Sequence, residues 1–176
     1  MALIDLLTKK KSVIVSRWFD AVLESYPQET ATFMKSQKNR FANPVGCTLA
    51  KEVEDVYSAL LKGSGDTEIT PFLDNIVRIR AVQDFSASAA VSFVFLLKRV
   101  VRQELGKEIK QNDLTDELLA FESQVDKLAL LSFDIYMSCR EKIYEIRVNE
   151  ARSNVHMLLR KAKLICDDPD SDSEVG

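Results

Sequence analysis

The side chains that most often carry out catalysis are few in this sequence and are not arranged for it. The one histidine, His156, has no Glu-x-x-His pair or HExxH motif around it. The glycine-rich stretch 62-KGSGD-66 lacks the spacing of a phosphate-binding loop and is typical of a turn. Acidic groups such as Asp113, Asp116 and Glu117 suit the positive end of a helix better than a catalytic carboxylate pair. We therefore expect no enzyme activity, no catalytic residue, no metal site and no cofactor.

Two arginines offer the clearest chance of binding a ligand. Arg78 and Arg80 stand in the apolar stretch 72-FLDNIVRIRAV-82, where helical spacing places Arg80 on the apolar face and Arg78 off it. A guanidinium on an apolar face must reach water, pair with an acid or bind an anion. Asp84, four residues further on, is the partner that we expect for Arg80. The alternative is an anion or ligand site that involves Arg78, Arg80 and Trp18.

Aromatic side chains suggest a second kind of site, a cavity for a small apolar ligand. The candidates to line it are Trp18, Phe33, Phe41, Phe93 and Phe95. Aromatic residues at helical spacing more often fill a hydrophobic core, and that is the interpretation we favour.

The composition is that of a single globular domain. The chain has 176 residues, of which 46% are hydrophobic and 29% charged, and a net charge of −3. That balance argues against nucleic-acid binding, which requires a basic surface. The apolar run 89-AAVSFVFLL-97 is much shorter than the roughly 20 residues of a membrane span. With no signal peptide and no CxxC pair among three cysteines, we predict a cytoplasmic protein without membrane insertion.

The hydrophobic pattern predicts an all-α protein. Apolar residues recur at steps of three and four along most of the chain, and glycine and proline are few. Asn43 before Pro44 is typical of a helix start, and Gly63 and Gly106 are expected to end helices. The predicted helices cover 2–25, 28–38, 44–62, 70–83, 87–105 and 114–165.

The last predicted helix is unusually long. At about 1.5 Å per residue it would reach about 80 Å, so we expect its far end to project from the domain. Apolar residues near that end alternate at steps of four and three, the spacing of positions a and d in a coiled coil. These are Tyr144, Val148, Ala151, Val155, Leu158, Ala162 and Ile165. We call them the seam; it predicts contact with a second copy or a partner, and the alternative is that the helix folds back onto its own domain.

These patterns divide the chain into three parts. We expect a helical sensor-like domain over 1–148 and a projecting, coiled-coil-like helix end over 149–166. The acidic, proline-containing residues 167–176 are expected to form a disordered tail.

Four segments, taken together and in order, resemble one known family. They are 17-RWFDAVLESYPQETATFMK-35, 40-RFANPVG-46, 73-LDNIVRIRAVQDFSASAAVSFVFLLK-98 and 128-LALLSFDIYMSCREKIYEIRVNE-150. Together they resemble the N-terminal domain of the RsbT co-antagonist proteins of the RsbRD type, over roughly residues 5–150.

The resemblance implies a stressosome-like regulatory sensor. Such domains are helical and globin-like without haem, they dimerise, and a long helix leads from them to a STAS output domain. His156, at the far end of the chain, is poorly placed for a haem ligand, which agrees with a fold without haem. No STAS or kinase sequence follows within the 176 residues, so we expect the signal to pass to a partner protein in trans.

We therefore predict a regulatory module that forms a homodimer through its last helix and acts on a partner protein. One alternative is a protein that binds a small apolar or anionic ligand. Another is an accessory subunit that docks on an enzyme complex through its acidic tail.

Overall fold

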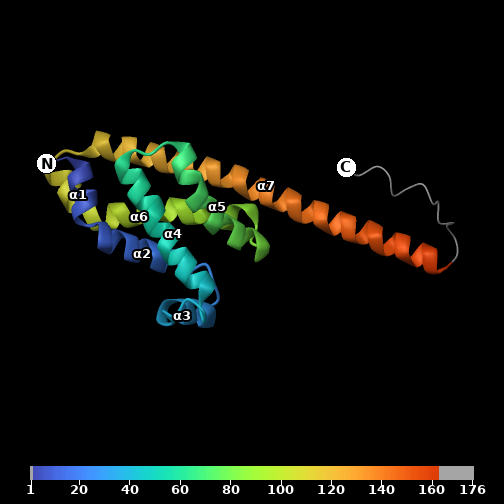
Figure 1. Ribbon diagram of the computed structural model, residues 1–176. Helices are drawn as coiled ribbons and strands as arrows, with labels where there is room; N and C mark the ends of the chain where they lie inside the picture. Colours follow the sequence, from blue (N-terminus) through green and yellow to red (C-terminus); the bar gives the residue numbers. More distant parts are fainter. Residues whose placement is uncertain (1, 163–176) are drawn as a thin grey trace. The chain divides into compact units, whose positions relative to one another are not determined.

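The computed structural model describes residues 2–162, and within them the chain forms helices and no strand, as predicted. The chain divides into two units, Met1–Cys139 and Arg140–Gly176, and the last helix runs through the division. The helices are α1 Leu3–Lys9, α2 Lys11–Leu23, α3 Gln28–Ser36, α4 Pro44–Lys62, α5 Asp66–Val82, α6 Ala87–Gln111 and α7 Thr115–Lys161 (Figure 1).

The helix predicted over 2–25 is divided in two at Lys10. This residue has φ −98° and ψ 14°, outside the helical region, and separates α1 from α2. Its ammonium donates to the carbonyl oxygen of Glu104 at 2.7 Å and to the carboxylate of Glu108 at 2.6 Å, both on α6. That contact also lowers the pKa of Glu108. The prediction missed this break because no glycine or proline marks it; the contacts of Lys10 lie far away in the sequence.

The start of α4 is confirmed and rests on Asn43. Its Oδ1 accepts from the backbone N–H of Gly46 at 2.9 Å, which caps the helix. Its Nδ2 donates to the carbonyl oxygens of Met34 and Gln37, both at 2.8 Å. A Cβ at position 46 would come within 2.4 Å of the Asn43 side chain, so glycine is needed there. Gly63 ends the helix with φ 66°, as expected for a left-handed C-cap.

Replacing Asn43 with alanine is expected to destabilise the fold by about 2–3 kcal/mol. The change removes the cap and takes the donor from the buried carbonyl oxygen of Met34 and the partly buried one of Gln37. Chemical denaturation monitored by circular dichroism measures the loss. Asn39→Ala is the control, because Asn39 caps only an exposed turn through Phe41 N at 2.9 Å. A similar loss in both variants would contradict this role of Asn43.

Two predicted helix ends are wrong. The helix predicted over 70–83 corresponds to α5, which begins at Asp66 and not at Thr70, so Pro71 lies inside it. Asp66 and Glu68 favour this earlier start because acids stabilise the first turn of a helix. The helix predicted over 87–105 corresponds to α6, which continues through Gly106 to Gln111. A helical glycine costs only about 1 kcal/mol relative to alanine, and the buried residues Leu105 and Ile109 on either side offset that cost.

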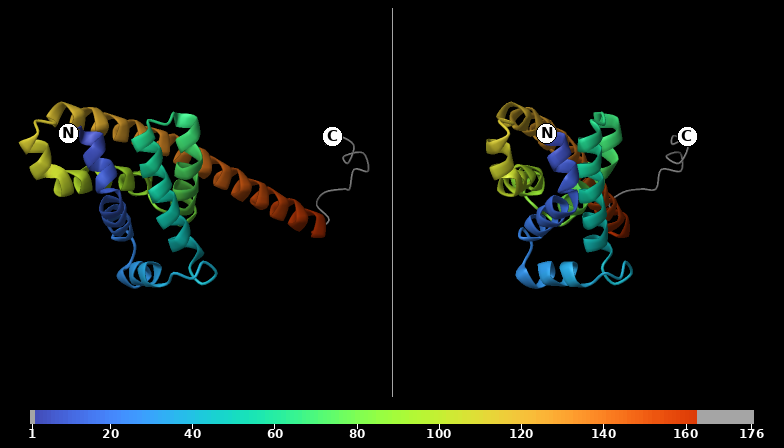
Figure 2. Two further views of the ribbon diagram at one scale, coloured as in Figure 1. Left: turned by 60° about the vertical axis from the view of Figure 1, so that its left-hand side comes forward. Right: turned by 90° about the vertical axis from the view of Figure 1, so that its left-hand side faces the viewer.

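The core of the first unit lies between helices that pack in pairs. Helix α4 lies beside α5, and α2 packs on α6, as two further views show (Figure 2). Within this unit the first half of α7 contributes a buried face at steps of three and four. Its buried residues are Leu118, Phe121, Glu122, Val125, Leu128, Ala129, Ser132 and Tyr136.

An ion pair joins α6 to this face of α7. Arg102 donates from Nε and Nη2 to both oxygens of Glu122, at 2.5 and 2.7 Å. The hydrogen bonds from Arg102 hold the pKa of Glu122 below its ordinary value of 4.5. A carboxylate with a depressed pKa contributes stability above its unfolded pKa, and this contribution is lost as the pH falls through the folded value.

Arg102→Gln is therefore expected to weaken the dependence of stability on pH below about pH 4.5, in addition to lowering stability at pH 7. Urea unfolding at a series of pH values measures both effects. Arg99→Gln is the control, since Arg99 lies 3.6 Å from the exposed Glu24 and not near Glu122. If stability fell with pH below about pH 4.5 as steeply in Arg102→Gln as in the natural chain, the role given to the Arg102–Glu122 pair would be contradicted.

Candidate functional site

The first candidate site is centred on Arg80, in the last turn of α5. Its side chain is fully buried, at 0% exposure, so it does not reach water. Arg78 is exposed and pairs with Asp74 at 2.7 Å, one helical turn back. The structure thus separates the two arginines, with Arg80 inside the fold and Arg78 on its surface.

The predicted pairing of Arg80 with Asp84 is wrong. Pairing at a spacing of four residues requires a continuous helix, and α5 ends at Val82. Asp84 lies in the following turn with φ 58°, so the chain has already changed direction. Arg80 Nη2 instead donates to Ser25 Oγ at 3.1 Å and to the carbonyl oxygen of Ala89 at 2.9 Å.

Aromatic rings surround the guanidinium group. The Arg80 Cζ atom lies 4.3 Å from the centre of the Phe85 ring, 5.5 Å from that of Tyr26 and 5.8 Å from that of Phe93. Burial lowers the pKa of Arg80 and raises that of Tyr26, because it disfavours the charged form of each. We call Arg80 and these three rings the arginine box.

The arginine box leaves two donors unsatisfied. Nε and Nη1 of Arg80 are buried and have no hydrogen-bond partner among the described residues. Buried polar groups in folded proteins are nearly always paired, so each exception requires an explanation. The sequence places Arg80 on an apolar face and predicts that an anion is one answer, but it does not identify the rings, because they come from three separate segments.

Trp18 and the other aromatic residues do not form a shared cavity. Trp18 is fully buried, donates from Nε1 to the carbonyl oxygen of Phe93 at 2.8 Å and stacks on the Phe93 ring at 6.4 Å. It belongs to the core and is one ring away from Arg80. Phe33, Phe41 and Phe95 are 49%, 98% and 47% exposed, so they line no interior space.

The arginine box is linked to α7 through the turn after α5. The hydroxyl of Tyr136, on α7, donates to the carbonyl oxygen of Phe85 at 2.6 Å. The hydroxyl of Tyr26 donates to Gln83 Oε1 at 3.1 Å, and its ring meets Phe85 edge to face. A change at Arg80 that moves Phe85 therefore acts directly on a hydrogen bond to α7.

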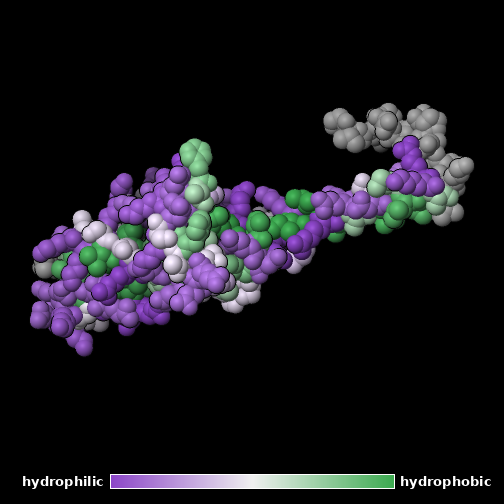
Figure 3. All heavy atoms as spheres, turned by 90° about the horizontal axis from the view of Figure 1, so that it is seen from below, coloured by the Kyte–Doolittle hydropathy of each residue, from purple (hydrophilic) through white to green (hydrophobic). Residues whose placement is uncertain are grey.

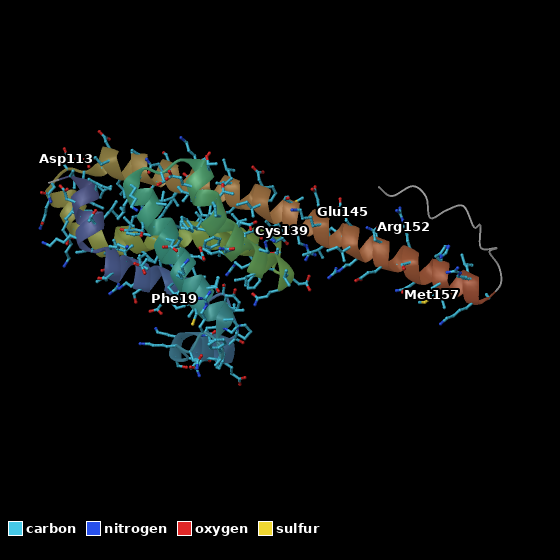
Figure 4. All side chains as sticks on the ribbon, viewed as in Figure 1. Phe19, Asp113, Cys139, Glu145, Arg152 and Met157 are labelled. Carbon is cyan, nitrogen blue, oxygen red and sulfur yellow. The ribbon has the colours of Figure 1, made fainter. Side chains whose placement is uncertain are left out.

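An open groove of about 590 Å³ lies on the first unit. It is lined by Phe19 of α2, labelled in Figure 4, and by Lys11 and Glu54, which pair at 3.1 Å. Its one carboxylate, Glu54, is paired with Lys11, and Arg80 does not line it. It is a weaker candidate than the arginine box.

The second candidate site is the seam, in the second unit. None of the described residues Arg140–Ala162 is buried within the chain. Among the seam residues, Tyr144 is 53%, Val155 55% and Leu158 63% exposed. Val148, Ala151 and Ala162 are exposed too, and Ile165 lies outside the described residues. Figure 3 shows hydrophobic atoms among hydrophilic ones along this part of α7.

The seam has polar neighbours on the same helix. Glu145 and Arg152, labelled in Figure 4, flank it, and His156 is exposed one position after Val155. Within residues 2–162, no three His, Cys, Asp or Glu side chains gather as metal ligands would. Among residues 2–162, none of the helices combines the length and the hydrophobicity that a membrane span requires.

Comparison with known proteins agrees with the resemblance seen in the sequence. The family profile of the RsbT co-antagonist protein rsbRD N-terminal domain matches residues 12–151. A protein of Archaeoglobus fulgidus, described only as uncharacterized, is 24% identical over 150 residues, which cover 82% of this chain and 87% of the relative. No solved structure matches the chain. The match over most of the sequence shows that this chain belongs to the RsbT co-antagonist protein rsbRD N-terminal domain family.

Proposed function

We propose that this protein is a non-catalytic sensor module in the cytoplasm that acts as a homodimer. Its family supports a role in signalling and regulation. In this proposal the first unit, with the globin-like arrangement that the resemblance implies, receives the signal. The seam joins two copies, and the geometry of their paired helices controls a partner protein in trans.

One observation supports this proposal above all others, the exposure of the seam. An isolated helix in water is only marginally stable, and most helices in proteins are held by packing of an apolar face. The segment Arg140–Lys161 is helical, yet all of its seam residues that are described are exposed. A second copy of the same segment would bury the seam on both helices, as in a two-stranded coiled coil.

Signalling requires that the dimer have two states which a ligand or partner binds unequally. The bond between Tyr136 and Phe85 provides a place where the two states can differ, because it fixes α7 to the turn beside Arg80. A shift of α7 at this point changes how its continuation meets the second copy. The partner protein then recognises one arrangement of the helix pair.

Native mass spectrometry at low micromolar concentration tests the assembly. We expect a dimer for the full chain and a monomer for a chain that ends at Asn149, because the shorter chain lacks the seam residues from Ala151 onward. Circular dichroism of the shortened chain verifies that the first unit remains folded. A dimer of the same strength after truncation would contradict the role of the seam.

A second candidate function is binding of a small anionic ligand, and the arginine box favours it. The buried Arg80 has two donors without a hydrogen-bond partner, Nε and Nη1, and no carboxylate partner among the residues that the structure describes. An apolar ligand gains no such support, because the aromatic residues line no shared cavity. The acidic tail, 167–176, lies outside the described residues, and nothing in residues 2–162 favours an accessory subunit.

A further inference from the structure

We propose that Arg80 binds a halide ion, chloride in the cell, inside the arginine box. The site consists of the guanidinium Nε and Nη1, the rings of Tyr26, Phe85 and Phe93, and the turn that follows α5. Binding itself is independent of the proposed function. The further claim, that this halide is the signal that the module senses, rests on the proposed function.

The first argument is one of charge. Burying a cation is costly unless it is paired, and Arg80 has no ion pair among the described residues. The three ring faces attract the cation, but they supply no full negative charge. The negative end of α5 and the positive end of α6 meet nearby, and their effects oppose each other. A water molecule can accept from one of the free N–H groups but leaves the charge uncompensated, whereas an anion accepts and also compensates the charge.

The second argument concerns the shape of the anion. Arginine clamps a carboxylate or phosphate through two adjacent nitrogens, as Arg102 does with its Nε and Nη2. On Arg80 both such edges include Nη2, which already donates to Ser25 and Ala89. The free donors, Nε and Nη1, lie on different edges of the guanidinium plane. They suit an acceptor that needs a single point of contact, and a halide is the simplest anion of that kind.

The third argument concerns access. Arg80 is fully buried, but it lies only one side chain below the surface: Ser25, which accepts from it, is exposed. Tyr26 closes the box through its bond to Gln83, an exposed residue of the turn. For the Tyr26 ring to move aside, this hydrogen bond and the edge-to-face contact with Phe85 must break. A small ion can therefore enter without unfolding of the helices.

Thermal unfolding at constant ionic strength tests the site, with sodium chloride replacing sodium gluconate in steps. Gluconate, a large organic anion, serves as the reference anion. A ligand at a hundredfold excess over its Kd, bound only to the folded chain, raises the unfolding midpoint by roughly 5–10 °C for a chain of this size. We expect a saturable rise of this kind with chloride and with bromide.

Two variants show whether the rise depends on Arg80. Arg80→Met fills a similar volume without charge and is expected to lose the halide response. Arg78→Met, its matched control, changes an exposed arginine that pairs with Asp74 and should retain the full response. Equal responses in Arg80→Met and the natural chain would overturn the proposal.

A direct observation covers the case in which Arg80→Met fails to fold. Crystals of the natural protein grown in bromide should show an anomalous scattering peak within hydrogen-bond distance of Arg80 Nε or Nη1. A water molecule there without an anomalous signal would overturn the proposal. So would a midpoint that rises with acetate or phosphate and not with chloride, because this assigns the site to a clamped oxyanion. The oligomeric state is measured separately, so a failure here leaves the proposed function to its own test.

Discussion

Glutamate in place of both Val148 and Val155 is expected to convert the dimer into a monomer, with a rise in Kd of at least 100-fold. Both positions correspond to a in the heptad and would face their counterparts in the second copy. Burying a valine contributes about 1.5–3 kcal/mol, and a carboxylate at the same place must be desolvated. A loss of about 2.8 kcal/mol already corresponds to a factor of 100 in Kd. Sedimentation equilibrium measures the change.

The same helix provides a matched control for this experiment. Ile146 and Met157 are 57% and 47% exposed, similar to the seam residues, but they lie outside positions a and d. The double variant Ile146→Glu, Met157→Glu introduces the same charge on the same segment. It should leave the Kd within a few-fold of the natural value. Equal loss of the dimer in both double variants would mean that added charge, and not the seam, determines assembly.

Truncation of Trp18 to alanine is expected to have the largest effect on stability, a loss of about 3–5 kcal/mol. Trp18 is fully buried and stacks on Phe93, and its Nε1 donates to the Phe93 carbonyl oxygen at 2.8 Å. Alanine leaves a large cavity and a carbonyl oxygen without its donor. Urea unfolding of the variant and of the natural chain, monitored by circular dichroism, gives the difference.

Two further variants test whether the loss at Trp18 comes from core packing. Trp18→Phe retains much of the ring and should lose less stability than Trp18→Ala. Phe33→Ala removes an aromatic residue that is 49% exposed and should cost less than about 1 kcal/mol. If Trp18→Ala were as stable as the natural chain, Trp18 would not be the core residue that the structure indicates.

Local signals in the sequence predicted much of the fold. Asn43 with Pro44 predicted the start of α4 and Gly63 its end, and both are confirmed. These signals work because a cap or a left-handed residue acts on its immediate neighbours. The continuous α7 was predicted from another local signal, the absence of glycine and proline from this stretch.

Features that depend on distant contacts were not predictable in this way. The break at Lys10 accompanies contacts with α6, and the continuation of α6 through Gly106 accompanies core packing. The surroundings of Arg80 depend on Tyr26 and Phe93, which are far from it in the sequence. Helical periodicity correctly placed Arg80 on an apolar face. The spacing of four residues also suggested an ion pair with Asp84, which was wrong because such a pattern does not show that the helix ends before Asp84.

The central claim is that the seam is an interface between two copies of the chain. Hydrogen exchange of the unmodified protein, measured across a range of concentrations, tests it most directly because it locates protection along the sequence. The account predicts that amides of residues 144–161 exchange fast in dilute solution and slowly at high concentration, while those of α4 do not change. Exchange over residues 144–161 that is equally fast at every concentration at which the protein is dimeric would contradict the account.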